Sequence, residues 1–379
     1  MKNLKRVFAT LLVVPLALFG GCSSEKADPD VEESSAEETV VETGPVELVD
    51  AVGRTVTLDQ PAQSVVAIGP AALRMVVYGG GADKVVGVEQ WEVDSQMGRP
   101  YALANPDFAE LPVIGQGGPN NAPSPEEILN VNPDIVFTTY AADAATADEF
   151  AEKIGVPVFV LPQIGQTAAA VFDGPVLESI TNIGQLLGTT EHAQGVVQYI
   201  ADARDDLQAR TADIPEADRP SVYVGGVGMR GSHGIESTQG SFAVLDVINA
   251  KNIADEAGTP GPLTVDREQI LAWNPDILII DLGGIELVRE DYGQNPDFYN
   301  ELKAVSEGRT YVELPYNFYG ANIDTALADA YFLGTVIYPD QFADVDPEAK
   351  ADEIYEALVG APVYEHMKSG YGAYGLIEW

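Results

Sequence analysis

Few of the side chains that do chemistry in proteins are present, and they are badly spaced for catalysis. The three histidines, His192, His233 and His366, lie far apart and never at the i, i+4 spacing that puts two metal ligands on one helix face. Cys22 is the single cysteine, which excludes an internal disulfide and any site built from several thiolates. The sequence has no nucleophile elbow, Ser-His-Asp spacing or metalloprotease motif. We therefore expect a protein that is not an enzyme, with no catalytic residues, no bound metal of its own and no cofactor.

One glycine-rich segment, residues 226–231, matches the G-x-G-x-x-G pattern of dinucleotide sites. That pattern binds a nucleotide where a helix starts directly after it and directs its N-terminus at the phosphates. Here Ser232-His233-Gly234 follows instead, which favours a loop. We expect no nucleotide site at these glycines.

Acidic side chains dominate the charge of the chain. Its 379 residues include 20 Lys and Arg against 59 Asp and Glu, which gives a formal net charge of −39. A basic groove can hardly be built from this composition, so nucleic acid is excluded as a partner. The length, with 46% hydrophobic residues, suggests two domains of ordinary size.

The N-terminus has the features of an export signal. Basic residues at positions 2, 5 and 6 precede an apolar run over 7–21 that is too short to span a bilayer. We therefore expect a signal peptide over 1–21. The run ends at Cys22 in a segment that resembles a bacterial lipobox, with Phe19 at a position where Leu is usual.

The next stretch is polar and strongly acidic. Residues 23–45 contain eight acids, one base and no aromatic residue, so they cannot bury enough surface to fold. We expect 22–45 to be a disordered acidic tether that starts at a lipidated Cys22. The predicted location is extracytoplasmic, with the lipid in the outer face of the cytoplasmic membrane.

Short apolar runs predict the strands. Two alternating runs about a glycine-containing turn over 46–58 predict a β-hairpin. Further runs rich in β-branched residues recur with helical or loop segments between them, which is typical of a parallel α/β sheet. They lie at 65–68, 85–88, 135–139, 156–161, 222–224, 277–281 and 310–314.

An internal repeat relates the two halves of the chain. Residues 126–137 recur as residues 268–279 at a constant offset of 142, with the shared pattern Glu-x-Ile-Leu-x-x-Asn-Pro-Asp-Ile. In each copy we expect a short helix that starts near the glutamate, turns its Ile-Leu pair toward the sheet, and ends at Asn-Pro before a strand. The repeat predicts two similar α/β lobes.

Helices connect these lobes. Val176, Ile180, Ile183 and Leu187 form one apolar stripe, and a longer stripe follows over 196–207. A helical connector is stiffer than coil, so it permits tilting of a few degrees and resists wide hinge closure. We expect an N-terminal α/β lobe over 46–167, a helical connector over 168–214 and a C-terminal α/β lobe over 215–379.

The order of these motifs resembles a known family, the substrate-binding lipoproteins of ABC importers for iron–siderophore, cobalamin and haem-type chelates. The resemblance rests on Asp50-x-x-Gly53-Arg54-x-Val56-x-Leu58, on the strands over 65–70 and 85–88, and on the repeated Asn-Pro-Asp segments. It implies two Rossmann-like lobes with mainly parallel sheets, joined by a rigid interdomain helix. It also implies an ABC permease dimer with its ATPase subunits as partner.

In that family one surface glutamate of each lobe docks on arginines of the permease. The matching positions are Glu126 and Glu268, which are also equivalent in the repeat. Two acids far apart on a rigid body fix its orientation and add charge-assisted bonds. The alternative is that each acid only complements the dipole of a helix start.

Ligands of open α/β sheets bind beyond the carboxyl ends of the strands, so the loops after the predicted strands hold the candidate site. These loops are rich in glycine and carry aromatic and arginine side chains. Rings can cover the organic surface of a metal chelate while arginines pair with its carboxylate or catecholate oxygens. The alternatives are surface ion pairs for the arginines and ordinary packing for the tyrosines. The candidate ligand-binding residues are Arg74, Trp91, Arg99, Tyr140, Met229, Arg230, Tyr316, Asn317 and Tyr319.

The sequence thus predicts a lipid-anchored receptor that captures an iron chelate between its lobes and delivers it to an ABC permease without chemical conversion. Cobalamin, haem or a molybdate-type oxyanion is the alternative solute on the same fold. An exported enzyme or a surface sensor that uses the same cleft is the alternative of another class. We expect the receptor to be a monomer.

Overall fold

The computed structural model describes residues 44–94, 96–119, 121–164, 168–228 and 231–379. The predicted signal peptide, the lipidation site Cys22 and nearly all of the tether lie outside the described residues, as do Met229 and Arg230. Within the described part of the chain, no helix has both the length and the apolar character that crossing a membrane requires.

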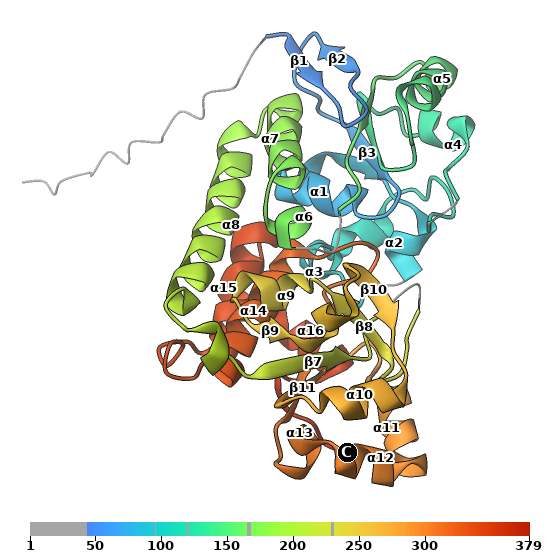
Figure 1. Cartoon of the computed structure of the whole chain (residues 1–379). Helices are drawn as coiled ribbons and strands as arrows, with labels where there is room; N and C mark the ends of the chain where they lie inside the picture. Colours follow the sequence, from blue (N-terminus) through green and yellow to red (C-terminus); the bar gives the residue numbers. More distant parts are fainter. Residues whose placement is uncertain (1–43, 95, 120, 165–167, 229–230) are drawn as a thin grey trace, which may run out of the picture. The chain divides into compact units, whose positions relative to one another are not determined.

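A four-stranded parallel sheet forms the centre of what we call the first lobe (Figure 1). Its strands are β3 (Val65–Ile68), β4 (Val85–Gly87), β5 (Ile135–Thr138) and β6 (Val158–Val160), in the order β4-β3-β5-β6. Strands β3, β5 and β6 are buried along their whole length, as parallel strands covered on both faces are. The predicted hairpin is β1 (Val46–Val49) with β2 (Thr55–Leu58), paired from Val46 opposite Leu58.

The second lobe repeats this topology. Strands β7 (Ser221–Gly225), β9 (Lys251–Asn252), β11 (Ile277–Asp281) and β12 (Thr310–Glu313) are parallel and take the order β9-β7-β11-β12, which matches β4-β3-β5-β6 strand for strand. An antiparallel strand β13 (Gly375–Leu376) extends the β12 edge, and β8 (Ser237–Gly240) pairs with β10 (Gly261–Thr264). The structure confirms the α/β class with mainly parallel sheets.

Helices lie between the strands in both lobes. Those of the first are α1 (Ala72–Tyr78), α2 (Gln90–Asp94), α3 (Pro100–Ala104), α4 (Pro125–Leu129) and α5 (Ala144–Ile154). Those of the second are α9 (Ala243–Val247), α10 (Arg267–Trp273), α11 (Ile285–Gln294), α12 (Pro296–Glu301), α13 (Lys303–Ser306), α14 (Ile323–Ile337), α15 (Pro347–Val359) and α16 (Tyr364–Tyr371).

The repeated segment forms α4 in one lobe and α10 in the other, each followed by a buried strand. Ile128 and Ile270 are fully buried, as expected. The prediction that the Ile-Leu pair of each copy turns to the sheet is wrong for the first copy, because Leu129 is 45% exposed, whereas Leu271 is half-buried against the hydrophobic core. Successive helix residues point about 100° apart, so the second residue of the pair lies at the edge of the buried face.

Two long helices connect the lobes. After the short α6 (Ala168–Phe172), α7 (Pro175–Leu187) and α8 (Thr190–Thr211) lie side by side (Figure 1, green). Their predicted apolar stripes are buried, including Ile180, Ile183, Ile200 and Leu207. Contact is close where the helices meet, since a Cβ at Gly184 would lie 2.4 Å from the Cβ of Ala193. One hydrophobic cluster runs without a break from β2 through these helices to α16.

Candidate functional site

The first sheet has its topological switch point between β3 and β5, because the chain leaves β3 for one side and returns on the other. The loops after these strands lie in close contact: the Thr139 hydroxyl donates to the Pro70 carbonyl at 3.0 Å. Gly69 has a positive φ of 93°, and a Cβ there would lie 2.4 Å from the Thr139 Oγ1. Only glycine fits at this position, so the backbone is held close to the strand ends.

Glu89, the second residue after β4, is the central polar group of this edge. Its carboxylate accepts hydrogen bonds from the Gly69 backbone N–H at 2.9 Å, the Tyr140 hydroxyl at 3.1 Å and the Tyr319 hydroxyl at 3.2 Å. The side chain is buried, and burial raises the pKa of Glu89 to about 7 although these three donors oppose the rise.

This pKa predicts how stability depends on pH. Because the Glu89 pKa is higher in the folded protein, about 7 against the usual 4.5, the folded state binds the proton more tightly. Its contribution is therefore most favourable below about pH 4.5 and is lost as the pH rises through about 7. Glu89→Gln should remove that part of the slope in a plot of unfolding free energy against pH.

Urea unfolding at a series of pH values measures this slope. Glu47→Gln, at an exposed position of β1, is the matched control and should leave the slope unchanged. Equal slopes for Glu89→Gln and the unsubstituted chain would contradict the assignment.

Tyr319 connects the second lobe to this cluster. Besides its bond to Glu89, its hydroxyl accepts from the Gly118 backbone N–H at 3.0 Å, and its ring lies 5.9 Å from that of Trp91. Its backbone has a φ of +55°, which is unfavourable for a bulky residue and is held by its surroundings. We use the name seam for the region where residues 315–322 of the second lobe contact the first lobe. The residues of the first lobe that take part lie within 69–140.

Arg99 is buried at the seam. Its Nη1 donates to the Trp91 carbonyl and to the Glu92 carboxylate, both at 2.7 Å. The guanidinium carbon lies 5.9 Å from the ring centre of Trp91, 5.4 Å from Phe318 and 5.0 Å from Tyr319. Aromatic rings from both lobes therefore surround one buried cation.

Arg74 is also fully buried, but it has a different environment. Its Nη1 donates to the Ala321 carbonyl at 2.8 Å and its Nη2 to the Phe318 carbonyl at 3.0 Å, while its guanidinium lies 5.0 Å from the ring of Tyr101. These contacts join α1 to the second lobe. The side chain thus holds the loop that carries Tyr319.

Two further buried polar contacts cross between the lobes. The Tyr78 hydroxyl donates to the Asp324 carboxylate at 2.8 Å, and the Asn322 side chain donates to the Gly98 carbonyl at 3.1 Å. Burial raises the pKa of both Tyr78 and Asp324, which keeps this pair protonated more readily than in water.

The seam therefore brings together Trp91, Arg99, Tyr140 and Tyr319 of the predicted ligand-binding residues. Tyr316 lies apart, because it is 1% exposed and packs edge-on against Phe242 with ring centres 5.4 Å apart. The Asn317 side chain donates to the Gly228 carbonyl at 3.2 Å, within the second lobe.

Two residues of the seam, Glu89 and Phe318, are not among the predicted site residues. Glu89 is the second residue after a strand, so the rule that directs attention to loops after strands could have found it. Nothing in the sequence distinguishes Glu89 from the other acids, because the chain has 59 carboxylates. Phe318 stands in the same loop as the predicted Tyr319.

The switch point of the second lobe lies between β7 and β11. A Cβ at Gly284 would lie 2.4 Å from the Gly226 carbonyl oxygen, so glycine permits this contact between loops. Within the described residues, the element that follows the 226–231 glycines is the strand β8. Burial raises the pKa of Asp281 at this edge to about 7.

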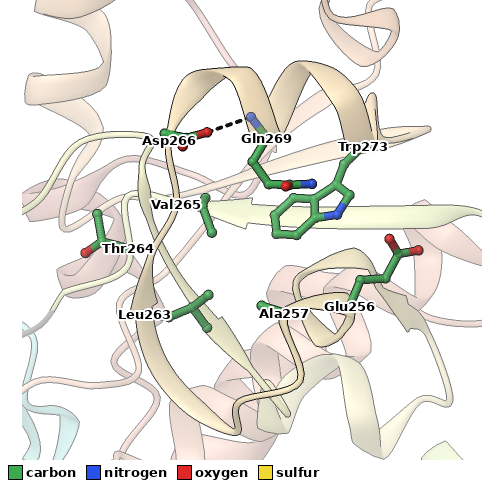
Figure 2. Close-up of a pocket in the computed structure, with 8 residues that line it drawn as sticks. All are labelled: Glu256, Ala257, Leu263, Thr264, Val265, Asp266, Gln269 and Trp273. Atoms are coloured by element: carbon green, nitrogen blue, oxygen red, sulfur yellow. Dashed lines mark hydrogen bonds between the residues drawn. The ribbon is translucent and has the colours of Figure 1, made fainter.

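Two cavities of about 380 Å³ lie at equivalent places of the two lobes. One lies against α10 (Figure 2), with Asp266 and the Trp273 ring on the side of the helix and Leu263 on the other side. The second surrounds the start of α4. Ser124 and Glu127 line the second where Asp266 and Gln269, 142 residues later, line the first. Neither cavity is lined by residues of both lobes.

The predicted docking residues stand beside these cavities. Glu126 and Glu268 are both exposed in the first turn of their helices. The two helices are capped by other residues. In α4, Ser124 and Glu127 form a capping box, and in α10 the Asp266 side chain accepts from the Gln269 backbone N–H at 2.8 Å. Neither of these caps uses Glu126 or Glu268, and both residues are exposed.

Across the described ranges, no three His, Cys, Asp or Glu side chains are arranged to hold a metal ion. The polar groups of the seam are instead carboxylate, phenol and guanidinium groups among aromatic rings. Such a set can bind a solute with organic surface and charged oxygens, and it presents no nucleophile activated by a base.

The chain is similar to two proteins with named solutes. A cobalamin-binding protein of Halobacterium salinarum is 26% identical over 277 residues, which cover 72% of this chain and 68% of that protein. The molybdate-binding protein MolA of Haemophilus influenzae is 22% identical over 326 residues, or 82% of this chain and 89% of that protein.

Solved structures share the fold. MolA of Haemophilus influenzae bound to molybdate has a TM-score of 0.64 at 19% identity, over 84% of this chain and 98% of that one. A periplasmic solute binding protein from Veillonella parvula has a TM-score of 0.67 at 18% identity, over 86% and 97%. The model of one family, described as periplasmic binding protein, matches residues 65–313. The chain therefore belongs to the periplasmic binding protein family, whose members are binding proteins rather than enzymes.

Proposed function

We propose that this protein is the extracytoplasmic solute-binding receptor of an ABC transporter, and that it captures an iron chelate of the siderophore class at the seam and delivers it to the permease. Membership of the periplasmic binding protein family supports the receptor role. The solute structure that we propose, a charged metal complex with an organic surface, follows from the side chains of the seam.

The observation that carries this proposal is the cluster of Trp91, Arg99, Phe318 and Tyr319. Rings from two lobes give apolar walls, and the arginine gives a charge-assisted donor for oxygens of the chelate. Trp91 is 37% exposed, so part of its indole is available for contact. A solute bound there would contact side chains of both lobes.

Equilibrium binding tests the proposal. The full chain, titrated with ferric siderophores, cobalamin, haemin and molybdate, is expected to bind a ferric siderophore with submicromolar affinity, with quenching of tryptophan fluorescence as readout. If the chain binds none of these solutes with submicromolar affinity, the receptor proposal in this form is wrong.

Cobalamin is the second candidate solute. Its support is the Halobacterium salinarum relative, together with an exposed indole on the wall of the seam that can lie against a flat macrocycle. In the same titration, tight binding of cobalamin without binding of ferric siderophores would favour it.

The partner and the anchor belong to the same proposal. We propose that Glu126 and Glu268 contact a permease dimer, each next to a cavity that can receive a side chain of one permease subunit. Two similar cavities on two repeated lobes suit two similar subunits. We also propose a lipid on Cys22, which the mass of the mature N-terminal peptide would reveal.

A further inference from the structure

The cavity against α10 has the composition of a site for a cation (Figure 2). Its walls include the Trp273 ring and two acids, Glu256 and Asp266, and none of the eight described residues that line it is basic. We propose that this cavity binds an organic cation, a guanidinium or alkylammonium group, against the Trp273 ring and next to Glu256. No residue of the seam lines the cavity, so the proposal does not depend on which solute the receptor captures.

Trp273 supplies the aromatic face for such a cation. It is the last residue of α10 and is half-buried. Its ring lies 6.1 Å from the ring of the fully buried Tyr223, at an angle of 44°, and this contact fixes the indole in place. Figure 2 shows the indole extending from α10 toward the segment that carries Glu256. Indole attracts cations more strongly than the other aromatic side chains do.

Two carboxylates give the cavity a negative charge. Glu256 lies on the short 3₁₀ helix η4 (Ile253–Ala257) and is exposed. Asp266 caps the start of α10, where its side chain accepts from the Gln269 backbone N–H, and it adds a second negative charge at the other end of that helix. A hollow lined by charges of one sign concentrates ions of the opposite sign, so a cation is drawn to the ring.

The base that lies nearest in sequence does not cancel this charge. Arg267 follows Asp266, but its Nε pairs with Glu236 at 2.7 Å and its Nη2 pairs with Asp291 at 2.8 Å. Neither Glu256 nor Asp266 forms an ion pair with a lysine or arginine in the part of the chain that the structure describes. The positive partner for this cavity must therefore come from outside the described chain.

The equivalent cavity of the first lobe has a different chemistry. Val131 stands 142 residues before Trp273, and no aromatic side chain is among the described residues that line that cavity. Its single acid, Glu127, already accepts from the backbone N–H and the hydroxyl of Ser124, both at 3.2 Å. We therefore expect only the α10 cavity to bind a cation.

An organic cation can reach this site from two sources. One is a free small cation such as choline. The other is an arginine side chain of a protein that contacts this face, and the permease proposed above is such a protein, because Glu268 is exposed on the same helix. Both sources present a positive group to the same ring.

Fluorine NMR of the full chain labelled with 5-fluorotryptophan tests the proposal, because the chain has three tryptophans. The titrants are choline, N-acetylarginine amide and its uncharged analogue N-acetylcitrulline amide, at one ionic strength set with sodium chloride. We expect choline or the arginine derivative to shift the Trp273 signal with a dissociation constant on the order of 1 to 10 mM, and the citrulline derivative to leave it in place. The Trp379 signal should not move, since that ring is already stacked on Tyr292 with ring centres 4.3 Å apart.

Glu256→Gln tests the carboxylate in the same titration. The substitution keeps the shape of the side chain and removes its charge, so the cation should bind roughly two- to fivefold more weakly, as expected for an exposed ion pair. The matched control is Glu152→Gln, at an exposed position of α5, which should leave the affinity unchanged.

The permease in proteoliposomes decides the source of the cation. Trp273→Leu removes the attraction of the ring for a cation and keeps an apolar side chain. If a permease arginine is the source, the receptor concentration that gives half-maximal ATPase stimulation should rise by at least about threefold, while Val131→Leu leaves it unchanged. An unchanged value for Trp273→Leu assigns the site to a free cation.

Three results would overturn the proposal: no shift of the Trp273 signal with either cation, an equal shift with the citrulline derivative, or equal affinity of Glu256→Gln and the unsubstituted chain. Each of them leaves the receptor proposal standing, because that proposal is tested by solute binding at the seam. These measurements need only the unsubstituted chain and a variant of an exposed residue, so they decide the question even if Trp273→Leu does not fold.

Discussion

Replacing Glu126 and Glu268 together by alanine is expected to abolish receptor-stimulated transport while solute affinity stays within about twofold. Both carboxylates are exposed. In the proposed complex each substitution removes a charge-assisted contact with a permease arginine, worth roughly 1.5 to 3 kcal/mol, so docking should weaken by at least about a hundredfold for the pair. Each single variant should retain part of the activity.

Stimulation of permease ATPase activity in proteoliposomes, measured against receptor concentration, gives the docking affinity. The matched control is Glu152→Ala with Glu301→Ala, one exposed helix acid from each lobe outside the repeated segment. Normal stimulation by the Glu126 and Glu268 double variant would refute docking through these residues and leave them as helix-start acids only.

Arg74→Ala is expected to lower the unfolding free energy by on the order of 3 to 5 kcal/mol. The substitution leaves the carbonyls of Ala321 and Phe318 buried without their donors and opens a cavity beside Tyr101. It also removes the contact that holds the Tyr319 loop against the first lobe, so solute binding at the seam should weaken as well.

Denaturant unfolding followed by circular dichroism measures the loss. Arg204→Ala is the control, since Arg204 pairs with the exposed Asp173 and Asp205 on the surface of α8 and should cost no more than about 1 kcal/mol. A loss for Arg74→Ala as small as that of the control would show that solvent satisfies the two carbonyls, and that Arg74 does not join the lobes.

Much of the fold could be predicted from the sequence because parallel strands are buried on both faces and read as continuous apolar runs. Strands β3 and β11 have the predicted limits. The repeat at an offset of 142 residues predicts two similar lobes, and their sheets have the same strand order. Strands β8 and β10 were not predicted, because segments such as Ser237-Thr238-Gln239-Gly240 carry no apolar alternation and depend on tertiary pairing.

The site was predicted less completely than the fold. The rule that ligands bind after strand ends selected Trp91, Tyr140 and Tyr319, which the structure brings together at the seam. It could not separate the roles of Arg74 and Arg99, because these depend on which acceptors of the second lobe each guanidinium reaches in three dimensions. Sequence spacing carries no information about such acceptors.

The continuous hydrophobic cluster of residues from both lobes and from α7 and α8 has a consequence for how this protein melts. Duplicated halves would ordinarily melt as separate domains, each with its own midpoint. Here the two halves share one hydrophobic core, and buried groups such as Tyr78 and Asp324 lose their partners if one half unfolds. Loss of order in one copy therefore carries the other with it, and calorimetry should record a single cooperative peak rather than two.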